Sequence, residues 1–203
     1  MEERRQSRTH AERKADSARE LMRAAVELIA ERGWERSSSA DIARRAGYSI
    51  TMVNARYGSR DGLLRALLLA YEDRFELGGP PRDNGLDELL DRVEILREQV
   101  RSDAATLRAF LMLWFEAVGP TAEHRSWIEA WFGRYLDDLT KIVERGQADG
   151  SIREDIDARD EARSFLDAGI GICYSWLLRA DPRIDSELVG LRRRTERLLR
   201  PPG

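Results

Sequence analysis

Apolar residues recur along most of the chain at the spacing of a helix face. Leu21, Ala25, Leu28 and Ile29 fall at i, i+4, i+7 and i+8, so they line one side of a helix that Gly33 would end. Similar stripes follow, separated by segments rich in glycine, proline and polar residues. The pattern predicts an all-α protein with helices at about 17–32, 39–46, 50–57, 61–77, 86–101, 104–118, 122–148, 158–180 and 185–200.

Two of the predicted helices are short and lie close together in the chain. Ser38 can open the first, because Asp41 three residues later completes a variant of the capping box, and Gly47 ends it. Ser49 can cap the second, which runs over 50–57 and stops at a glycine. Two short helices joined by a glycine-containing turn predict a helix-turn-helix.

Charge is distributed unevenly along the 203 residues. The net formal charge is −3, but residues 1–60 carry 13 Lys and Arg against 9 Asp and Glu, a net of +4. The remainder carries 21 basic against 28 acidic residues, a net of −7. A basic first third on an acidic body indicates that only the first third meets a polyanion.

Cysteine content and hydropathy indicate a cytoplasmic protein. The single Cys173 excludes an internal disulfide and is typical of a reducing compartment. The N-terminal segment is charged and lacks the apolar stretch of a signal peptide, and no apolar run reaches the roughly 18–20 residues that span a bilayer. We therefore expect no membrane partner.

One stretch of the chain has the pattern of a known family. Residues 18–64 contain, in register, the segments "AAVELIAERGW", "DIARRAGYS" and "VNARYGSRDGLL". This stretch resembles the DNA-binding domain of the tetracycline-repressor (TetR) family. The chain from "VERGQADGSIREDID" to its end looks like the regulatory domain of the same family.

Together with the charge pattern, the resemblance implies an architecture and a function. The expected architecture is a flexible basic arm over 1–15, a helix-turn-helix DNA-binding domain over 16–60 and a helical ligand-binding and dimerisation domain over 61–203. The expected function is that of a ligand-responsive repressor. It would bind a palindromic double-stranded DNA operator as a homodimer and be released by a small apolar or amphipathic effector. The alternative is a ligand-blind or architectural DNA-binding protein with a solid helical core.

The helix over 50–57 is the expected recognition helix. Val53 and Tyr57, at i and i+4, would anchor it to its own domain, while Thr51, Asn54, Ala55 and Arg56 point away. Asparagine can pair with adenine, arginine with guanine, and an apolar tip can meet a thymine methyl. Serines at helix starts suit phosphate, although capping alone also explains them, and the residue that opens the next helix resembles the family's backbone-contacting lysine. The candidate DNA-binding residues are Ser38, Ser39, Ser49, Ile50, Thr51, Met52, Asn54, Arg56, Tyr57 and Arg60.

The sequence contains no recognisable catalytic set. His10 lies in the arm, His124 stands alone near a helix start, and Cys173 is on an apolar helix that predicts a core position. Carboxylates are abundant but spread over solvated helix faces, and no metal-ligand spacing is present. We therefore expect no enzymatic activity, no metal and no cofactor.

Aromatic residues are concentrated on three of the predicted helices. They repeat at i, i+4 and i+8 on the helix over 122–148 and at i and i+4 on those over 61–77 and 104–118. Such stripes are typical of a plain core, but the resemblance implies that these helices surround an effector cavity. The candidate ligand-binding residues are Tyr71, Phe75, Phe110, Trp114, Trp127, Trp131 and Tyr135.

The last two helices are expected to form a dimer interface. The helix over 158–180 is apolar over a wide arc, which predicts burial on more than one side, and the helix over 185–200 has one apolar stripe. Two such helices from each of two chains would make a four-helix interface, although an internal bundle of one chain is the alternative. The candidate dimerisation residues are Phe165, Gly169, Ile172, Trp176, Leu188, Leu191 and Leu198.

Overall fold

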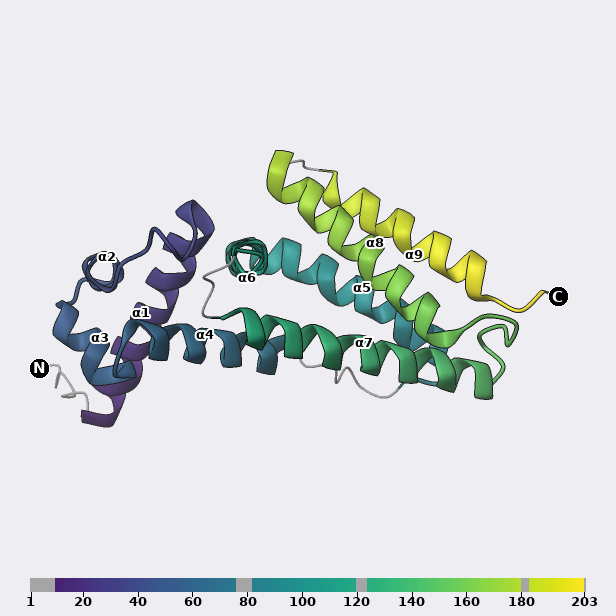
Figure 1. The fold of residues 1–203 in the computed structure, drawn as a ribbon, viewed down its shortest axis with the longest axis horizontal. Coiled ribbons are helices and arrows are strands. Elements are labelled where there is room, and N and C mark those ends of the chain that lie inside the picture. The colour runs from purple at the N-terminus through teal and green to yellow at the C-terminus, as the bar shows by residue number, and fades with distance from the viewer. Residues whose placement is uncertain (1–9, 76–81, 120–123, 180–182, 203) are drawn as a thin grey trace, which may run out of the picture. The chain divides into compact units, whose positions relative to one another are not determined.

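All regular structure in the described part of the chain is helical (Figure 1). The computed structural model describes residues 10–75, 82–119, 124–179 and 183–202. Two compact units divide the chain, Met1–Phe75 and Glu76–Gly203. The helices are α1 (His10–Arg32), α2 (Ser39–Arg45), α3 (Ile50–Tyr57), α4 (Arg60–Phe75), α5 (Gly85–Ser102), α6 (Ala104–Glu116), α7 (Arg125–Ala148), α8 (Ala158–Arg179) and α9 (Ile184–Leu199).

These helices lie where the apolar stripes predicted them, with one clear difference near the N-terminus. Helix α1 begins at His10, so residues 10–15 are helical and do not belong to an arm. The segment "HAERKA" holds good helix formers and no breaker, and Glu12 lies in the first turn, where a carboxylate is favourable. The rest of the expected arm, 1–9, lies outside the described residues.

Helices α1 to α4 form the N-terminal unit. Helix α1 packs on α2 and α3, and α3 packs on α4. The division after Phe75 therefore lies later than the domain boundary expected after residue 60, because α4 packs against the helix-turn-helix that precedes it. The fully buried side chains of this unit include Leu21, Ile29, Ile42, Val53 and Leu63.

A glycine lets α4 begin directly after α3. A Cβ at Gly62 would lie 1.9 Å from the carbonyl oxygen of Tyr57, so a larger residue would push the two helices apart. The hydroxyl of Ser59 accepts the Gly62 N–H at 3.0 Å and caps the first turn of α4. The end of the helix-turn-helix and the start of α4 are thus held in one geometry.

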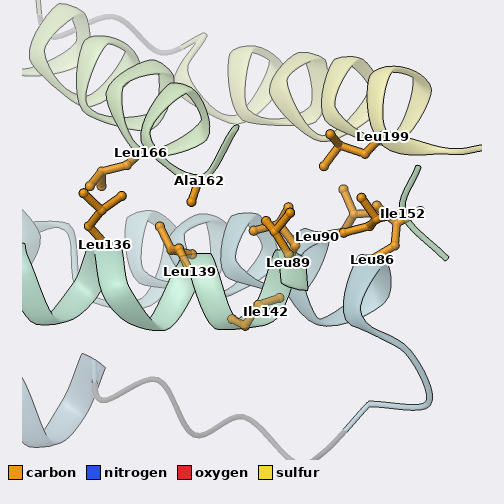
Figure 2. Close-up of a cluster of buried hydrophobic side chains, with 11 residues drawn as sticks. Leu86, Leu89, Leu90, Leu136, Leu139, Ile142, Ile152, Ala162, Leu166 and Leu199 are labelled. Carbon is orange, nitrogen blue, oxygen red and sulfur yellow. The ribbon is translucent and has the colours of Figure 1, made fainter. Parts of the chain in front are cut away.

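Helices α5 to α9 form the C-terminal unit. Helices α7 and α9 each pack against both α5 and α8, and α6 adjoins α5 and α8. Figure 2 shows leucines of α5 and α7 meeting Ala162 and Leu166 from α8 and Leu199 from α9. This core is built from Leu86, Leu89, Leu90, Leu136, Leu139, Ile142, Val143, Ile152, Ala162, Leu166 and Leu199.

Close backbone approach sets the position of α5 against α7. A Cβ at Gly85 would lie 2.3 Å from the backbone nitrogen of Gly146, so the two helices touch where neither has a side chain. The N–H of Gly85 donates to the Asp149 carboxylate at 2.8 Å, and the N–H of Leu86 donates to the Ser151 hydroxyl at 3.1 Å. The start of α5 is therefore fixed to the turn that follows α7.

Candidate functional site

The first helix of the helix-turn-helix opens with a complete capping box. The Ser38 hydroxyl accepts the Asp41 N–H at 3.1 Å and donates to the Asp41 carboxylate at 2.7 Å, which also accepts the Ser38 N–H. The hydrogen bond from Ser38 holds the pKa of Asp41 below its usual value. Ser38 thus has a capping role in this structure, while Ser39 is the half-buried first residue of α2.

A left-handed glycine makes the turn between α2 and α3. Gly47 has a φ of 76°, and the following Tyr48 N–H donates to the Ala43 carbonyl at 2.8 Å. Ser49 then stands at the N-cap of α3 in an extended conformation, but its side chain makes no capping hydrogen bond. Its exposed hydroxyl therefore remains available to an outside partner such as a phosphate oxygen.

Helix α3 has one buried side and one exposed side. Val53 is fully buried, whereas Ile50 is 49% exposed and Thr51 and Asn54 are exposed beside it. Met52 is half-buried at the edge of this surface. We call the exposed side, formed by Ile50, Thr51, Asn54 and Ala55, the α3 face. Ala55 was not among the sequence candidates, because a small apolar residue carries no signal of DNA contact.

Two candidate residues of α3 contact the domain itself. The Arg56 Nε donates to the Ser17 hydroxyl at 2.8 Å, and the Tyr57 hydroxyl donates to the Ala18 carbonyl at 2.9 Å. Burial raises the pKa of Tyr57. The helical pattern predicted that Arg56 points away from the domain. Instead, both Arg56 and Tyr57 donate hydrogen bonds that connect α3 to α1. Both lie within one turn of buried Val53, which brings them to the edge of the packed side.

The side chain of Arg60 also turns inward. Its Nε donates to the Ser37 carbonyl at 3.0 Å, and its Nη2 donates to the Trp34 carbonyl. The guanidinium lies 4.0 Å from the centre of the Trp34 ring, a cation–π arrangement. Trp34 is itself buried, so Arg60 links the start of α4 to the loop that joins α1 and α2. The DNA backbone contact expected of Arg60 stays a prediction, and in this structure the side chain is bound to its own domain.

Aromatic rings gather between α6 and α7 in the C-terminal unit. The ring centre of Phe110 lies 5.1 Å from that of Trp114, 6.3 Å from Trp127 and 5.7 Å from Trp131. Trp131 lies 4.9 Å from Trp114 and stacks on Tyr135 at 5.0 Å with an interplanar angle of 17°. These rings include five of the predicted ligand-binding residues. We call the following set the aromatic cluster: Phe110, Trp114, Trp127, Trp131, Phe132 and Tyr135.

Phe132 joins the aromatic cluster although the sequence did not single it out. Its ring lies 4.8 Å from Trp114, but its position directly after Trp131 places it off the i, i+4 stripe. The other two candidates belong to the N-terminal unit: Tyr71 is a buried residue of α4, and the side chain of Phe75 lies outside the described residues. The six residues of the aromatic cluster come from α6 and α7.

Polar groups lie buried among or beside these rings. The Trp114 Nε1 is buried and has no hydrogen-bond partner within the described residues. A buried donor left in this way costs about 1–3 kcal/mol. Burial raises the pKa of Tyr135 to about 12, an effect that the nearby Arg92 cation opposes, and Arg92 itself is only 8% exposed. Burial also raises the pKa of Cys173 to about 12, so its thiol stays protonated.

Most residues predicted at a dimer interface are used inside one chain. Leu188 and Leu191 are buried with Val93 and Ile184 in a core cluster. The side chains of Phe165, Ile172 and Trp176 pack against the same cluster, so this set does not form a free surface. These side chains are buried or half-buried because α9 packs on both α5 and α8.

A different stripe of α8 is exposed. Gly171, Tyr174 and Leu178 fall at i, i+3 and i+7, and Tyr174 and Leu178 are 47% and 67% exposed. A Cβ at Gly169 or Gly171 would meet nothing within 4 Å. Leu198 on α9 is 61% exposed, as a residue of an interface would be in a single chain. We call Gly171, Tyr174 and Leu178 the α8 stripe.

Metal binding and membrane insertion are two further properties on which the structure bears. In the residues it describes, no group of three or more His, Cys, Asp and Glu side chains is placed to hold a metal ion. His124 is buried, and its Nε2 lies 2.9 Å from the Leu113 carbonyl oxygen. None of the described helices is long and apolar enough to cross a membrane.

The N-terminal unit matches a known sequence family. The family described as "Bacterial regulatory proteins, tetR family" matches residues 21–67, which span the second half of α1, all of α2 and α3, and the first half of α4. No curated protein sequence matches the chain.

Solved structures share the fold along nearly the whole chain. The fatty acid degradation regulator FadR from Bacillus halodurans is 16% identical, with a TM-score of 0.76 over 89% of this chain and 94% of that chain. SmeT, the repressor of the Stenotrophomonas maltophilia multidrug efflux pump SmeDEF, is 17% identical, with a TM-score of 0.73 over 93% and 94%. The TetR regulator TylP from Streptomyces fradiae is 18% identical, with a TM-score of 0.74 over 94% and 90%. At such identities the likeness establishes the fold.

Proposed function

We propose that the chain, whose residues 21–67 match the TetR family of bacterial regulatory proteins, is a ligand-responsive transcriptional repressor that binds a palindromic operator as a homodimer. The observation that carries this proposal is the α3 face. A short helix is fixed to its own domain by Val53, Arg56 and Tyr57 and leaves Thr51 and Asn54 exposed. Recognition helices have this division between a packed side and a side that enters the major groove.

The chemistry of the α3 face suits base edges. Asn54 can donate to and accept from an adenine edge, and Ile50 can contact a thymine methyl. Ser49, at the start of the same helix, can donate its hydroxyl to a phosphate. The net charge of +4 over residues 1–60, against −7 for the remainder, favours DNA contact by the N-terminal unit.

Dimerisation would supply a second helix-turn-helix, which binds the second half-site of a palindromic operator. Paired helix-turn-helix units bind half-sites about 34 Å apart, one turn of the double helix. The α8 stripe and Leu198 offer exposed apolar surface for a four-helix contact between two chains. This surface replaces the predicted set, whose members Leu188 and Leu191 lie in the core.

The aromatic cluster is the proposed effector site. Flat rings and few polar groups are typical of pockets for small apolar molecules. SmeT, which shares the fold, has been solved in complex with triclosan, and that complex has a TM-score of 0.78 to this chain at 17% identity. An effector need supply only about 1–3 kcal/mol of coupling to change operator affinity 5- to 150-fold. A chain in which these rings only fill a core would be a ligand-blind DNA-binding protein.

The direct test of the recognition helix is to substitute its exposed polar residues. Asn54→Ala and Thr51→Ala should each cost about 1–3 kcal/mol of operator affinity, because each removes a base contact. Both side chains are exposed, so the melting temperature should stay that of the wild type. Affinity would be measured by fluorescence anisotropy on a fragment selected from the chain's own upstream DNA.

Ser102→Ala is a suitable control, because Ser102 is an exposed residue at the end of α5 in the C-terminal unit. It should bind the same fragment like the wild type. If both α3 variants also bind like the wild type, the α3 face does not read the operator.

A further inference from the structure

The guanidinium of Arg56 is held at one edge and free at the other. Its Nε donates to the Ser17 hydroxyl at 2.8 Å. Within the described residues its two Nη atoms have no hydrogen-bond partner and no ion pair, and solvent reaches both. Because most N–H donors of a guanidinium are on the Nη atoms, the free edge can bind an anion through two parallel hydrogen bonds.

The side chain of Ser17 is suited to fix this orientation. It is 2% exposed, and its hydroxyl donates to the Lys14 carbonyl at 3.0 Å, about one turn earlier in α1. Since a hydroxyl has a single proton, its oxygen is left as an acceptor for Arg56. The hydroxyl carries no charge, so this contact orients the guanidinium without neutralising it.

Carboxylates pair with other arginines of the N-terminal unit. Arg45 from α2 binds Glu31 from α1 at 2.8 Å, and Arg19 binds Asp16 within α1. Among the residues that the structure describes, no carboxylate forms an ion pair with Arg56. The positive charge of Arg56 therefore remains available to an anion from outside the chain.

Arg56 lies at the edge of the α3 face. Met52 and Arg56 are one helical turn apart, and both are half-buried, whereas Asn54 and Ala55 beside them are exposed. A helix in the major groove lies between the phosphates that border the groove. A cation at the edge of the base-reading side is therefore placed closer to a phosphate than to a base edge.

We propose that Ser17 is a positioning residue that holds the Arg56 guanidinium toward a DNA phosphate at the edge of the major groove. Arg56 then contributes affinity that does not depend on base sequence, in place of the guanine contact expected from the sequence. Its side chain is ordered before DNA binds, so less conformational entropy is lost on binding. This inference rests on the proposed DNA-binding function and adds the role of Ser17 to it.

The first variant removes the phosphate contact but keeps the bond to Ser17. The amide nitrogen of Arg56→Gln stands at the same place along the side chain as Nε, so it can still donate to the hydroxyl. Arg56→Gln should melt like the wild type and bind the operator about tenfold or more weakly. The slope of log affinity against log salt concentration should fall by about 0.9 for each contact. Fluorescence anisotropy of the full chain on the operator measures both quantities.

The second variant tests Ser17 itself. Ser17→Ala should weaken operator binding about two- to tenfold, because the guanidinium must then be ordered on binding. In the Arg56→Gln background, Ser17→Ala should cost no further affinity, since the positioned group is already absent. A merely structural bond would cost the same in both backgrounds, because it is present in both. Ser17→Thr keeps the hydroxyl and should retain wild-type affinity, and the comparison of the two backgrounds decides if this variant does not fold.

Arg45→Ala is the matched control for the loss of a positive charge. It removes an arginine of the same unit that Glu27 and Glu31 already neutralise, so it should keep the wild-type salt slope. Operator variants with single base changes provide a further readout. Arg56→Gln should weaken its binding to all of them by the same factor, because a phosphate contact does not depend on the base.

The outcomes distinguish this inference from the wider function. An unchanged salt slope in Arg56→Gln, an equal cost of Ser17→Ala in both backgrounds, or a loss confined to one base would overturn the inference. Selective operator binding by the wild type would uphold the proposed function in each of these cases. A wild type that does not distinguish the operator from scrambled DNA would contradict the proposed function. The salt slope of Arg56→Gln on scrambled DNA would then still test the phosphate contact.

Discussion

Arg60 holds the first turn of α4 to the loop between α1 and α2. Its guanidinium donates to the carbonyls of Ser37 and Trp34 and covers the Trp34 ring. Ser37 is fully buried, and its hydroxyl donates to the Gly33 carbonyl at 2.6 Å, so Arg60 joins an existing network. We therefore expect Arg60 to position the helix-turn-helix and not to contact a DNA phosphate.

Arg60→Ala should destabilise the protein by about 1.5–3 kcal/mol, because hydrogen bonds from a charged group are lost. Operator affinity should fall, but the slope of log affinity against log salt concentration should stay that of the wild type. Loss of a phosphate contact would instead reduce this slope by about 0.9 for each contact. Anisotropy titrations at several salt concentrations and thermal melting measure both quantities.

Arg60→Lys is the control, because it keeps the charge but loses the planar fork that meets two carbonyls. Its stability should resemble that of Arg60→Ala. Its slope of log affinity against log salt concentration should be that of the wild type. An alanine variant with unchanged melting temperature and a reduced slope would assign Arg60 to the DNA backbone after all.

Single residues of α3 show what periodicity can predict. Val53 and Asn54 lie on the buried and exposed sides that a period of 3.6 residues assigns to them. Arg56 does not follow the pattern, because its partner Ser17 is 39 positions away in the chain. Helical spacing places a Cα on a face, but long side chains such as arginine reach partners that only the folded chain brings near.

Helix α8 was correctly predicted to be apolar around most of its circumference. The sequence could not assign its stripes, because several adjacent stripes carry large apolar residues and their partners depend on how α5 and α9 pack. Leu166 and Cys173 entered the core, Ile172 and Trp176 pack beside α9, and Leu178 remained exposed. Exposure in the single chain is therefore the reason for proposing the α8 stripe as the surface that a partner chain covers.

Leu178→Asp should weaken dimerisation by about 3 kcal/mol or more, a factor of at least about 100, because it buries an unpaired carboxylate in the interface. Sedimentation equilibrium would measure the dissociation constant. Leu69→Asp is the matched control, since Leu69 is an exposed leucine of α4 in the N-terminal unit, 49% accessible. A Leu178→Asp protein that remains as dimeric as the control would move the interface away from the α8 stripe.

The aromatic stripes also show what helical spacing can and cannot predict. Residues at i, i+4 and i+8 on α7 did come together with Phe110 and Trp114 of α6. The sequence did not predict that Arg92 is buried, because an arginine on a predicted helix is expected to be solvent-exposed until its neighbours are known. In the structure Arg92 is only 8% exposed, and its guanidinium pairs with Glu88 on the same helix.

At the level of the whole molecule, the sequence predicted the helices better than the division between the units. Caps, glycines and apolar periodicity are local signals, and they placed α2 to α9 closely. The division after Phe75 depends on α4 packing against α3, which includes the contact between Gly62 and the Tyr57 carbonyl. The charge asymmetry, in contrast, follows directly from the sequence. It favours contact between the N-terminal unit and a polyanion.

The measurement that tests the account most directly is binding of the full chain to its own upstream intergenic DNA over a range of salt concentrations. The account predicts two chains on one site, a preference of at least about 10³ over scrambled DNA and a log affinity that falls steeply and linearly with log salt. Weak binding that is equal for all sequences would contradict it. The chain would then share the fold of the family without reading DNA through the α3 face.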